Sequence, residues 1–361
     1  IDSININKAL FFGQISDDYG ISTFQIVYYD QDLPNQKHSV PLEVTKTIPQ
    51  TFYYQFPNAL NLKKGKAYEL YFQVTDNDAI HGNKSTKSNK FNYRQKTKEE
   101  LIQEQLNDQK ETIKQLETTV QNQTQQKKVF SKLEAEIQMK KAFNWNDKTK
   151  VDEFIRNQKQ YQQMMERQTE KLHKSLNKED EQNLKDKRKQ LQQRIEELLK
   201  LNKQKKLLDE LQKIAEKFDK EELIKKTKAL AQKNKQQERS LERILELTKR
   251  FYVEEKTLQI ANKLKKLSKS QDTIKNNGPK TLNKQQKISE KFDEISKELE
   301  ELANDNKQLK SPMKIPQMPE ETEEVKESLS KTKEKLTNDQ NQEAKKYQKK
   351  SSKKMQQMSQ L

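Results

Sequence analysis

The chain has 361 residues and a formal net charge of +17, and only 30% of its residues are hydrophobic while 35% are charged. A composition this polar excludes one large hydrophobic core, so most of the chain must be extended and solvated. Cysteine is absent, which excludes disulfides and thiolate metal sites.

Glycine and proline divide the sequence into two regions. Neither residue occurs from Asn83 to Asn277, whereas four of the five glycines precede this stretch. Because these residues are the strongest breakers of regular structure, their absence predicts long helices. Residues 1–94 contain 10 Lys and Arg against 9 Asp and Glu, so the remainder carries 16 of the 17 net charges. We therefore expect a near-neutral module followed by a basic helical region.

The first region has the pattern of short strands. Phe24, Ile26 and Tyr28 alternate with more polar positions, and the same alternation returns from Tyr68 to Val74. Further strand candidates are Leu10–Ile15, Val40–Ile48, Thr51–Phe56 and Lys90–Tyr93. Six or seven short strands in fewer than a hundred residues predict an immunoglobulin-like antiparallel β-sandwich.

Acidic turns of this module form a candidate cation site. In the predicted strand order, the turn with Asp17 and Asp18 lies at the same end as the loop with Asp76 and Asp78. Four converging carboxylates would suit calcium. Aspartate also caps turns with its own side chain, and no D-x-D-x-D-G series is present, so turn capping is the favoured interpretation.

Capping signals predict where the helices of the second region begin. Thr97 and Glu100 have the spacing of a capping box, which predicts a helix to about Ala142. Asn146 or Asp147 is expected to cap the next helix, and Asp219 offers a further start. The segment Asn276–Pro279 is a predicted stop. A second stop contains three prolines, Pro312, Pro316 and Pro319.

Apolar residues on these helices follow the spacing of a coiled-coil seam. The clearest series steps by four and three along one helix and comprises Ile288, Phe292, Ile295, Leu299, Leu302, Asn306 and Leu309. Shifts of phase elsewhere favour helices that fold back on their neighbours over one uninterrupted rod. We expect this seam to contact protein partners or a second copy of the chain.

The basic surface leaves another kind of partner open. Only eight of the 72 basic residues are arginine, so the region offers charge without the bidentate contacts of specific nucleic-acid recognition. Loose binding to a polyanion is the alternative function. A helix lying on a membrane needs a broad apolar face, which these narrow stripes lack. The densest basic run, Lys345–Lys354, has the pattern of a solvated, disordered tail.

Nothing in the sequence indicates catalysis. The three histidines, His38, His81 and His173, are isolated from one another. The segment from His81 to Thr86 lacks the glycine spacing of a phosphate-binding loop. We expect neither an enzyme nor a cofactor.

Four segments resemble those of one family of long bacterial proteins. Gly13–Ser22 is similar to the start of a module in these proteins, and Asp76–Ala79 is similar to a later motif. Ala261–Leu264 and Leu309–Pro316 resemble the helical region of the family, which is called domain of unknown function 4175. The resemblance implies an extracytoplasmic segment of an inner-membrane protein, attached through hydrophobic helices that this chain lacks. It supplies no catalytic residues.

These inferences predict a non-enzymatic structural or scaffolding segment of a bacterial envelope protein. The chain opens at Ile1 without an initiator methionine, and we expect it to be part of something longer. The expected parts are a β-sandwich at 1–95, a long helical region at 96–277 with breaks near 143–147 and 218–220, a coiled-coil helix at 280–310, and a Lys-rich tail at 311–361 that is helical or disordered.

Overall fold

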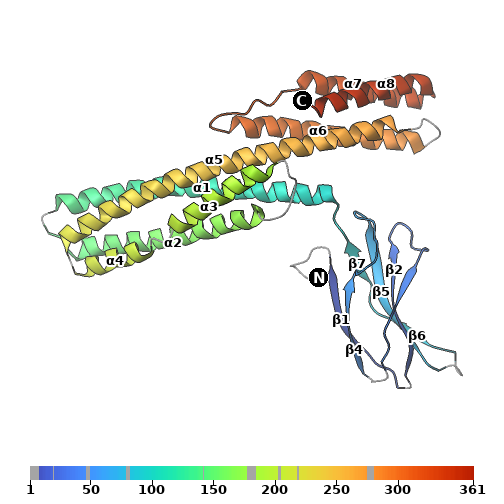
Figure 1. Ribbon diagram of the computed structural model, residues 1–361, viewed down its shortest axis with the longest axis horizontal. Coiled ribbons are helices and arrows are strands. Elements are labelled where there is room, and N and C mark those ends of the chain that lie inside the picture. Colours follow the sequence, from blue (N-terminus) through green and yellow to red (C-terminus); the bar gives the residue numbers. More distant parts are fainter. Residues whose placement is uncertain are drawn as a thin grey trace. The chain divides into compact units, whose positions relative to one another are not determined.

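The computed structural model describes residues 8–18, 20–45, 49–78, 82–140, 142–176, 184–201, 205–217, 219–274 and 280–361. The chain divides into two compact units, Ile1–Glu104 and Gln105–Leu361. The first unit contains the strands and the second contains most of the helical residues (Figure 1). An antiparallel β region followed by helices confirms the coarse prediction of fold class.

The β unit consists of two antiparallel sheets. Its strands are β1 (Ala9–Ile15), β2 (Ile21–Asp30), β3 (His38–Leu42), β4 (Gln50–Phe56), β5 (Ala67–Asp76), β6 (Ser85–Lys87) and β7 (Phe91–Arg94). Strands β1 and β4 pair in one sheet. The other sheet has the order β3-β2-β5, and β6 and β7 pair with different stretches of β5.

One hydrophobic cluster joins the two sheets of this unit. Phe24 and Ile26 of β2 point to the same face because they are two residues apart, and both are buried. They share a cluster with Tyr54 and Phe56 of the smaller sheet. Phe24 and Phe52 meet edge to face with their ring centroids 4.8 Å apart. Alternating aromatic residues therefore account for the packing of sheet on sheet.

The helices are α1 (Lys98–Met139), α2 (Trp145–Leu176), α3 (Lys185–Leu201), α4 (Lys205–Glu216), α5 (Lys220–Asp272), α6 (Lys280–Lys307), α7 (Pro319–Thr337) and α8 (Asn341–Met358). Three predicted starts have a cap. Thr97 and Glu100 exchange the two hydrogen bonds of a capping box. The Asp219 carboxylate accepts from the Glu222 N–H at 3.0 Å, as predicted.

The predicted cap of α2 was wrong by two or three residues. The backbone N–H of Asp147 donates to the Asn144 side chain, and the Asn144 N–H donates to the Asp147 carboxylate, each at 3.1 Å. Asn144 is therefore the cap, and Asp147 lies three residues inside the helix as the second half of the box. The prediction failed because a carboxylate reaching back to the cap resembles a cap in the sequence.

Helix α5 belongs to two successive bundles. Its first half packs with α1, α2, α3 and α4 through two clusters, one around Leu211 and Leu230 and one around Ile195 and Leu241. Its second half forms a ring with α6, α7 and α8, in which each helix contacts two others. We call these the first and second bundle, and Figure 1 shows α5 running through both.

Polar pairs give the direction and register of the second bundle. Lys263 contacts Glu298, and Gln271 donates to Gln285 at 3.1 Å, so α6 runs antiparallel to α5. The hydroxyl of Ser352 on α8 donates to the Ser268 carbonyl of α5 at 3.0 Å. Small serines at this contact allow the two helices to approach closely.

Residues 311–361 were expected to be either helical or disordered, and most of them form the helices α7 and α8. Lys345–Lys354, read from sequence as a disordered tail, lies within α8 and is helical. Ser351, Ser352 and Met355 are buried on the inner face of α8. Lysines occupy the opposite face, so the basic run is part of an amphipathic helix that packs through one face. The predicted stop at Asn276–Pro279 lies outside the described residues.

Candidate functional site

The acidic turns of the β unit come together as expected from the strand order. The Asn77 N–H donates to the Gly20 carbonyl at 3.1 Å, which joins the β1–β2 turn to the loop after β5. Asp17 accepts from the Gly20 N–H at 3.1 Å, and Asp76 accepts from the Lys84 N–H at 2.9 Å. Asp17 and Asp76 therefore act as turn caps in this structure.

The other two calcium candidates, Asp78 and Asp18, lie in the same two turns. Asp78 donates its backbone N–H to the Asp76 carboxylate at 3.3 Å, and Asp18 lies beside Asp17 in the turn. Among the described residues, no group of three His, Cys, Asp or Glu side chains is placed to hold a metal ion.

The predicted contact seam of α6 lies inside the second bundle. Five of its apolar side chains are buried in one cluster, and Leu299 packs against that cluster with partial exposure; the buried five are Ile288, Phe292, Ile295, Leu302 and Leu309. Their cluster includes Leu264 of α5, Val325 of α7 and Met355 of α8. In the single chain, the seam expected to contact a partner is therefore covered by the chain's own helices. The heptad pattern identified a buried face but not the helices that cover it.

The polar member of the seam holds the segment that follows α6. The Asn306 side chain accepts from the Met313 N–H and donates to the Met313 carbonyl, both at 2.8 Å. Arg250 of α5 donates to the Ser311 carbonyl at 2.8 Å, and Glu246 accepts from the Lys310 N–H at 3.2 Å. These contacts fix residues 310–313 against α5.

The chain that continues from Met313 to Met318 forms one wall of an apolar pocket of about 410 Å³ in the helical unit. The floor comes from α5 and α6 and contains the buried residues Ile260, Leu264 and Leu302. Partly buried Met313, Ile315 and Met318 of the α6–α7 connection enclose it, together with residues near the ends of α3 and α8. Pockets of this size and lining are typical of small-molecule sites.

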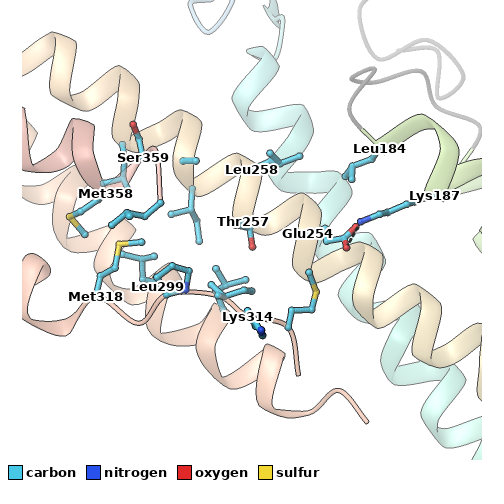
Figure 2. Close-up of a pocket in the computed structure, with 18 residues that line it drawn as sticks. Leu184, Lys187, Glu254, Thr257, Leu258, Leu299, Lys314, Met318, Met358 and Ser359 are labelled. Atoms are coloured by element: carbon cyan, nitrogen blue, oxygen red, sulfur yellow. Dashed lines mark hydrogen bonds and ion pairs between the residues drawn. The ribbon is translucent and has the colours of Figure 1, made fainter. Parts of the chain in front are cut away.

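Five polar side chains line the pocket, and four have partners within the chain. Lys187 contacts Glu254 at 2.6 Å, Thr257 donates to the Val253 carbonyl at 2.7 Å, and Ser359 donates to the Gln356 carbonyl at 2.7 Å. The fifth, Lys314, is exposed and makes no ion pair within the described part of the chain. Figure 2 shows Lys314 between the Lys187–Glu254 pair at one end and Met318 and Met358 at the other.

A buried ion pair stabilises the same bundle. Lys256 of α5 contacts Asp305 at 2.8 Å and Glu301 at 3.2 Å, and its side chain is 6% exposed. Although burial lowers the pKa of Lys256, hydrogen bonds to Asp305 and Glu301 and the nearby Tyr252 raise it above its usual value. Burial raises the pKa of Glu301, but the hydrogen bond and charge of Lys256, together with Lys110, lower it overall below its usual value. The contacts of Lys256 with Glu301 and Asp305 join α5 to α6.

The outer face of α8 carries lysines without partners. Lys345, Lys349 and Lys353 are exposed, and none of them makes an ion pair among the described residues. At 100° per residue they lie on one stripe, opposite the buried Ser351 and Met355. We call these three residues the lysine stripe. Such a row concentrates positive potential on one helix face.

The two histidines among the described residues have separate partners. His38 stacks on Tyr28 with a centroid separation of 5.4 Å, and His173 lies 3.6 Å from Glu196 on the helical unit. His81 lies outside the described residues.

Two features of the structure were missed by sequence reasoning. The pocket could have been suspected from three apolar residues that lie among the prolines after α6, namely Met313, Ile315 and Met318. A solvent-exposed linker seldom needs such residues. The Lys256 ion pair had no signal in the sequence, because nothing near Lys256 along the chain distinguishes it from the many other lysines.

None of the described helices combines the length and the apolar character that a membrane crossing requires. Comparison with family models, with curated proteins and with solved structures finds no match to the chain.

Proposed function

We propose that this chain is a non-enzymatic scaffolding segment of a bacterial envelope protein, held at the extracytoplasmic side of the inner membrane by a part outside this sequence. The localisation and the relation to the domain of unknown function 4175 family rest on the resemblance of Gly13–Ser22, Asp76–Ala79 and the helical motifs. The function itself rests on the helices.

The finer features of the fold belong to the same proposal. We infer that the β unit is an immunoglobulin-like sandwich, which the shared core of its two antiparallel sheets supports. We infer that α5 and α6 pack as a short antiparallel coiled coil. The burial of Ile288, Phe292 and Ile295 at spacings of four and three supports this packing.

The observation that carries the scaffolding proposal is the span of α5. Its 53 residues correspond to about 80 Å of continuous helix, and its apolar residues enter all three hydrophobic clusters of the helical unit. A helix anchored along its length by successive cores resists bending. Such a strut holds attached parts at a fixed separation, which is what a scaffold requires.

A partner can contact the buried part of the α6 seam only if the second bundle opens. Phe292 and Leu302 are 0% and 2% exposed in the single chain, so a partner helix reaches them only if α7 and α8 move away. Otherwise, partners must bind the outer surfaces. In the β unit, Phe12 and Tyr53 lie opposite each other in the β1–β4 sheet and are 80% and 65% exposed.

Site-specific photo-crosslinking in cells tests this proposal. A benzophenone side chain is placed at Tyr53, at Leu299 or at Lys349 of the full-length gene product. Scaffolding predicts discrete protein adducts from at least one position and co-fractionation with the inner membrane. Adducts from Leu299, which is partly exposed beside the buried seam, would indicate a partner next to the seam, whereas adducts from the other positions would indicate contact at other surfaces. A soluble cytosolic protein without adducts would overturn the proposal.

A second candidate function, binding to a polyanion, is favoured by the lysine stripe of α8. Three ammonium groups on one face, without an ion pair among the described residues, attract phosphate or carboxylate polymers and release their counterions. Because a lysine ammonium is a point charge and lacks the planar guanidinium of arginine, this binding would not depend on the sequence of the polymer.

Titration with DNA and with an acidic cell-surface polymer at two salt concentrations tests the second candidate. The variant K345E/K349E/K353E should weaken binding at low salt and reduce the steepness of its salt dependence. The matched control is K284E/K287E/K291E, which removes equal charge from exposed positions of α6. Equal loss in both variants would indicate net charge alone, and no binding by the unaltered chain would reject the candidate.

A further inference from the structure

We propose that the α5–α6 pocket binds a single-chain amphiphile with an anionic headgroup, of the kind represented by a long-chain carboxylate. The pocket is the one bounded by Ile260 and Leu264 below and by Met313, Ile315 and Met318 on one side. This inference is independent of scaffolding, since it concerns a small-molecule site within one unit.

The lining determines what the body of the ligand must be. Thirteen of the eighteen lining residues are apolar or aliphatic, and the side chains that form the floor are almost fully buried. Methionine is unbranched and polarizable, so Met313, Met318 and Met358 can adjust to a flexible chain. An extended hydrocarbon chain satisfies such a lining without leaving buried polar groups unpaired.

The polar groups determine what the head must be. Lys187 and Glu254 neutralise each other, and Thr257 and Ser359 donate to carbonyls of their own helices. A polar partner such as a peptide backbone would therefore find few groups to bind in this lining. Lys314 is the lining cation without an ion pair among the described residues, so it selects one anionic group at the rim.

Specific hydrogen bonds hold the wall of the pocket in place. The Asn306 side chain clamps both backbone groups of Met313, and the Arg250–Ser311 hydrogen bond holds the same connection on α5. This connection contributes both the apolar wall and Lys314. Lys314 therefore directly follows a backbone position that Asn306 holds in place.

Methyl NMR of methionine tests the proposal, because the chain carries its own controls. Dodecanoate below its micellar concentration should shift the methyl signals of Met313, Met318 and Met358, while those of Met139 and Met165, outside the pocket, remain unchanged. Dodecyltrimethylammonium has the same chain and the opposite charge, and it should bind at least tenfold more weakly. Each methylene added to a shorter carboxylate should raise affinity about fourfold until the pocket is full.

Two variants separate the head from the chain. Lys314→Glu changes an exposed side chain and should weaken dodecanoate at least fivefold while strengthening the cationic probe; Lys291→Glu on the α6 surface is the matched control. Ala261→Phe fills the pocket from α5 and should abolish binding of both probes. No shift at the three pocket methionines, equal affinity for the two probes, or shifts spread over all methionines would each overturn the proposal.

Discussion

Single residues determine where the aromatic rings of the β unit can lie. Gly13 of β1 is opposite Phe52 of β4. A β carbon added at Gly13 would lie 2.6 Å from the Phe52 ring, well inside van der Waals contact. Phe52 in turn contacts Phe24 and Phe72 of the larger sheet. The ring therefore cannot retreat without disturbing the shared core.

We predict that Gly13→Ala destabilises the β unit by about 1–3 kcal/mol, because it overpacks this contact. Near-ultraviolet circular dichroism during urea unfolding measures the effect, since 15 of the 25 aromatic residues lie in residues 1–94. Gln14→Ala, at an exposed position of the same strand, should change stability little. An unchanged midpoint for Gly13→Ala would show that Phe52 has room to move.

Lys256 is the most buried charged side chain among the described residues of the second bundle. Replacing Lys256 by Met keeps the aliphatic stem but leaves Asp305, which is 16% exposed, without its partner. We predict a loss of about 2–4 kcal/mol in the urea unfolding of the helices, measured by circular dichroism at 222 nm. Lys310→Met removes an exposed pair with Glu242 and should cost less than about 1 kcal/mol.

The Lys256 ion pair should make stability depend on pH in a defined direction. Because folding lowers the pKa of Glu301, its contribution is present above the ordinary carboxyl value and is lost as pH falls through the folded pKa. Because folding raises the pKa of Lys256, its contribution is lost only in strong alkali. The difference between unaltered protein and Lys256→Met should therefore be constant from pH 6 to 9 and shrink below about pH 4.

At the scale of elements, the helix starts depend on local side chains. Asp219 caps the 53-residue α5, and both bundles depend on this helix. Its carboxylate satisfies the Glu222 N–H, which otherwise has no partner within the helix.

We predict that Asp219→Ala destabilises the helical unit by about 1 kcal/mol, the usual value of an N-cap. Hydrogen exchange should localise the loss to the first turn of α5, around Glu222 and Leu223. Asp219→Asn retains the acceptor and should restore most of the protection. Global loss of protection, with no excess at the first turn, would contradict a local cap.

Helix α8 shows how an element can be hidden by its composition. Its buried positions are filled by Ala344, Gln348, Ser351, Ser352, Met355 and Met358, and only two of these six are large apolar residues. The usual apolar signal is therefore weak, while six lysines dominate the sequence. Close packing against Ser268 of α5 requires small side chains, and this need explains the weak signal.

At the scale of the whole molecule, the β unit and the helical unit each have their own hydrophobic clusters. Changes in one unit should leave the other unaffected. Gly13→Ala should move only the near-ultraviolet transition, and Lys256→Met only the helical transition. In the double variant the two losses should add within about 0.5 kcal/mol. A coupling above 1 kcal/mol would show that the units unfold as one.

Much of this organisation was accessible from the sequence because it is local. The β–helix boundary, the caps at Thr97 and Asp219 and the buried face of α6 follow from breakers, short-range hydrogen bonds and periodicity. Such signals act within a few residues of the chain. The acidic turns also came together as expected, because strand order determines which loops share an end.

The amino-acid sequence alone thus determined the division between strands and helices and the buried face of α6, but not helix α8. Only the tertiary structure decided that α5, α7 and α8 cover the α6 seam, that Lys256 meets Asp305, and that Lys314 stands at the rim of an apolar pocket. Periodicity specifies that a face is buried, but the choice of its partner depends on packing between residues far apart in the chain.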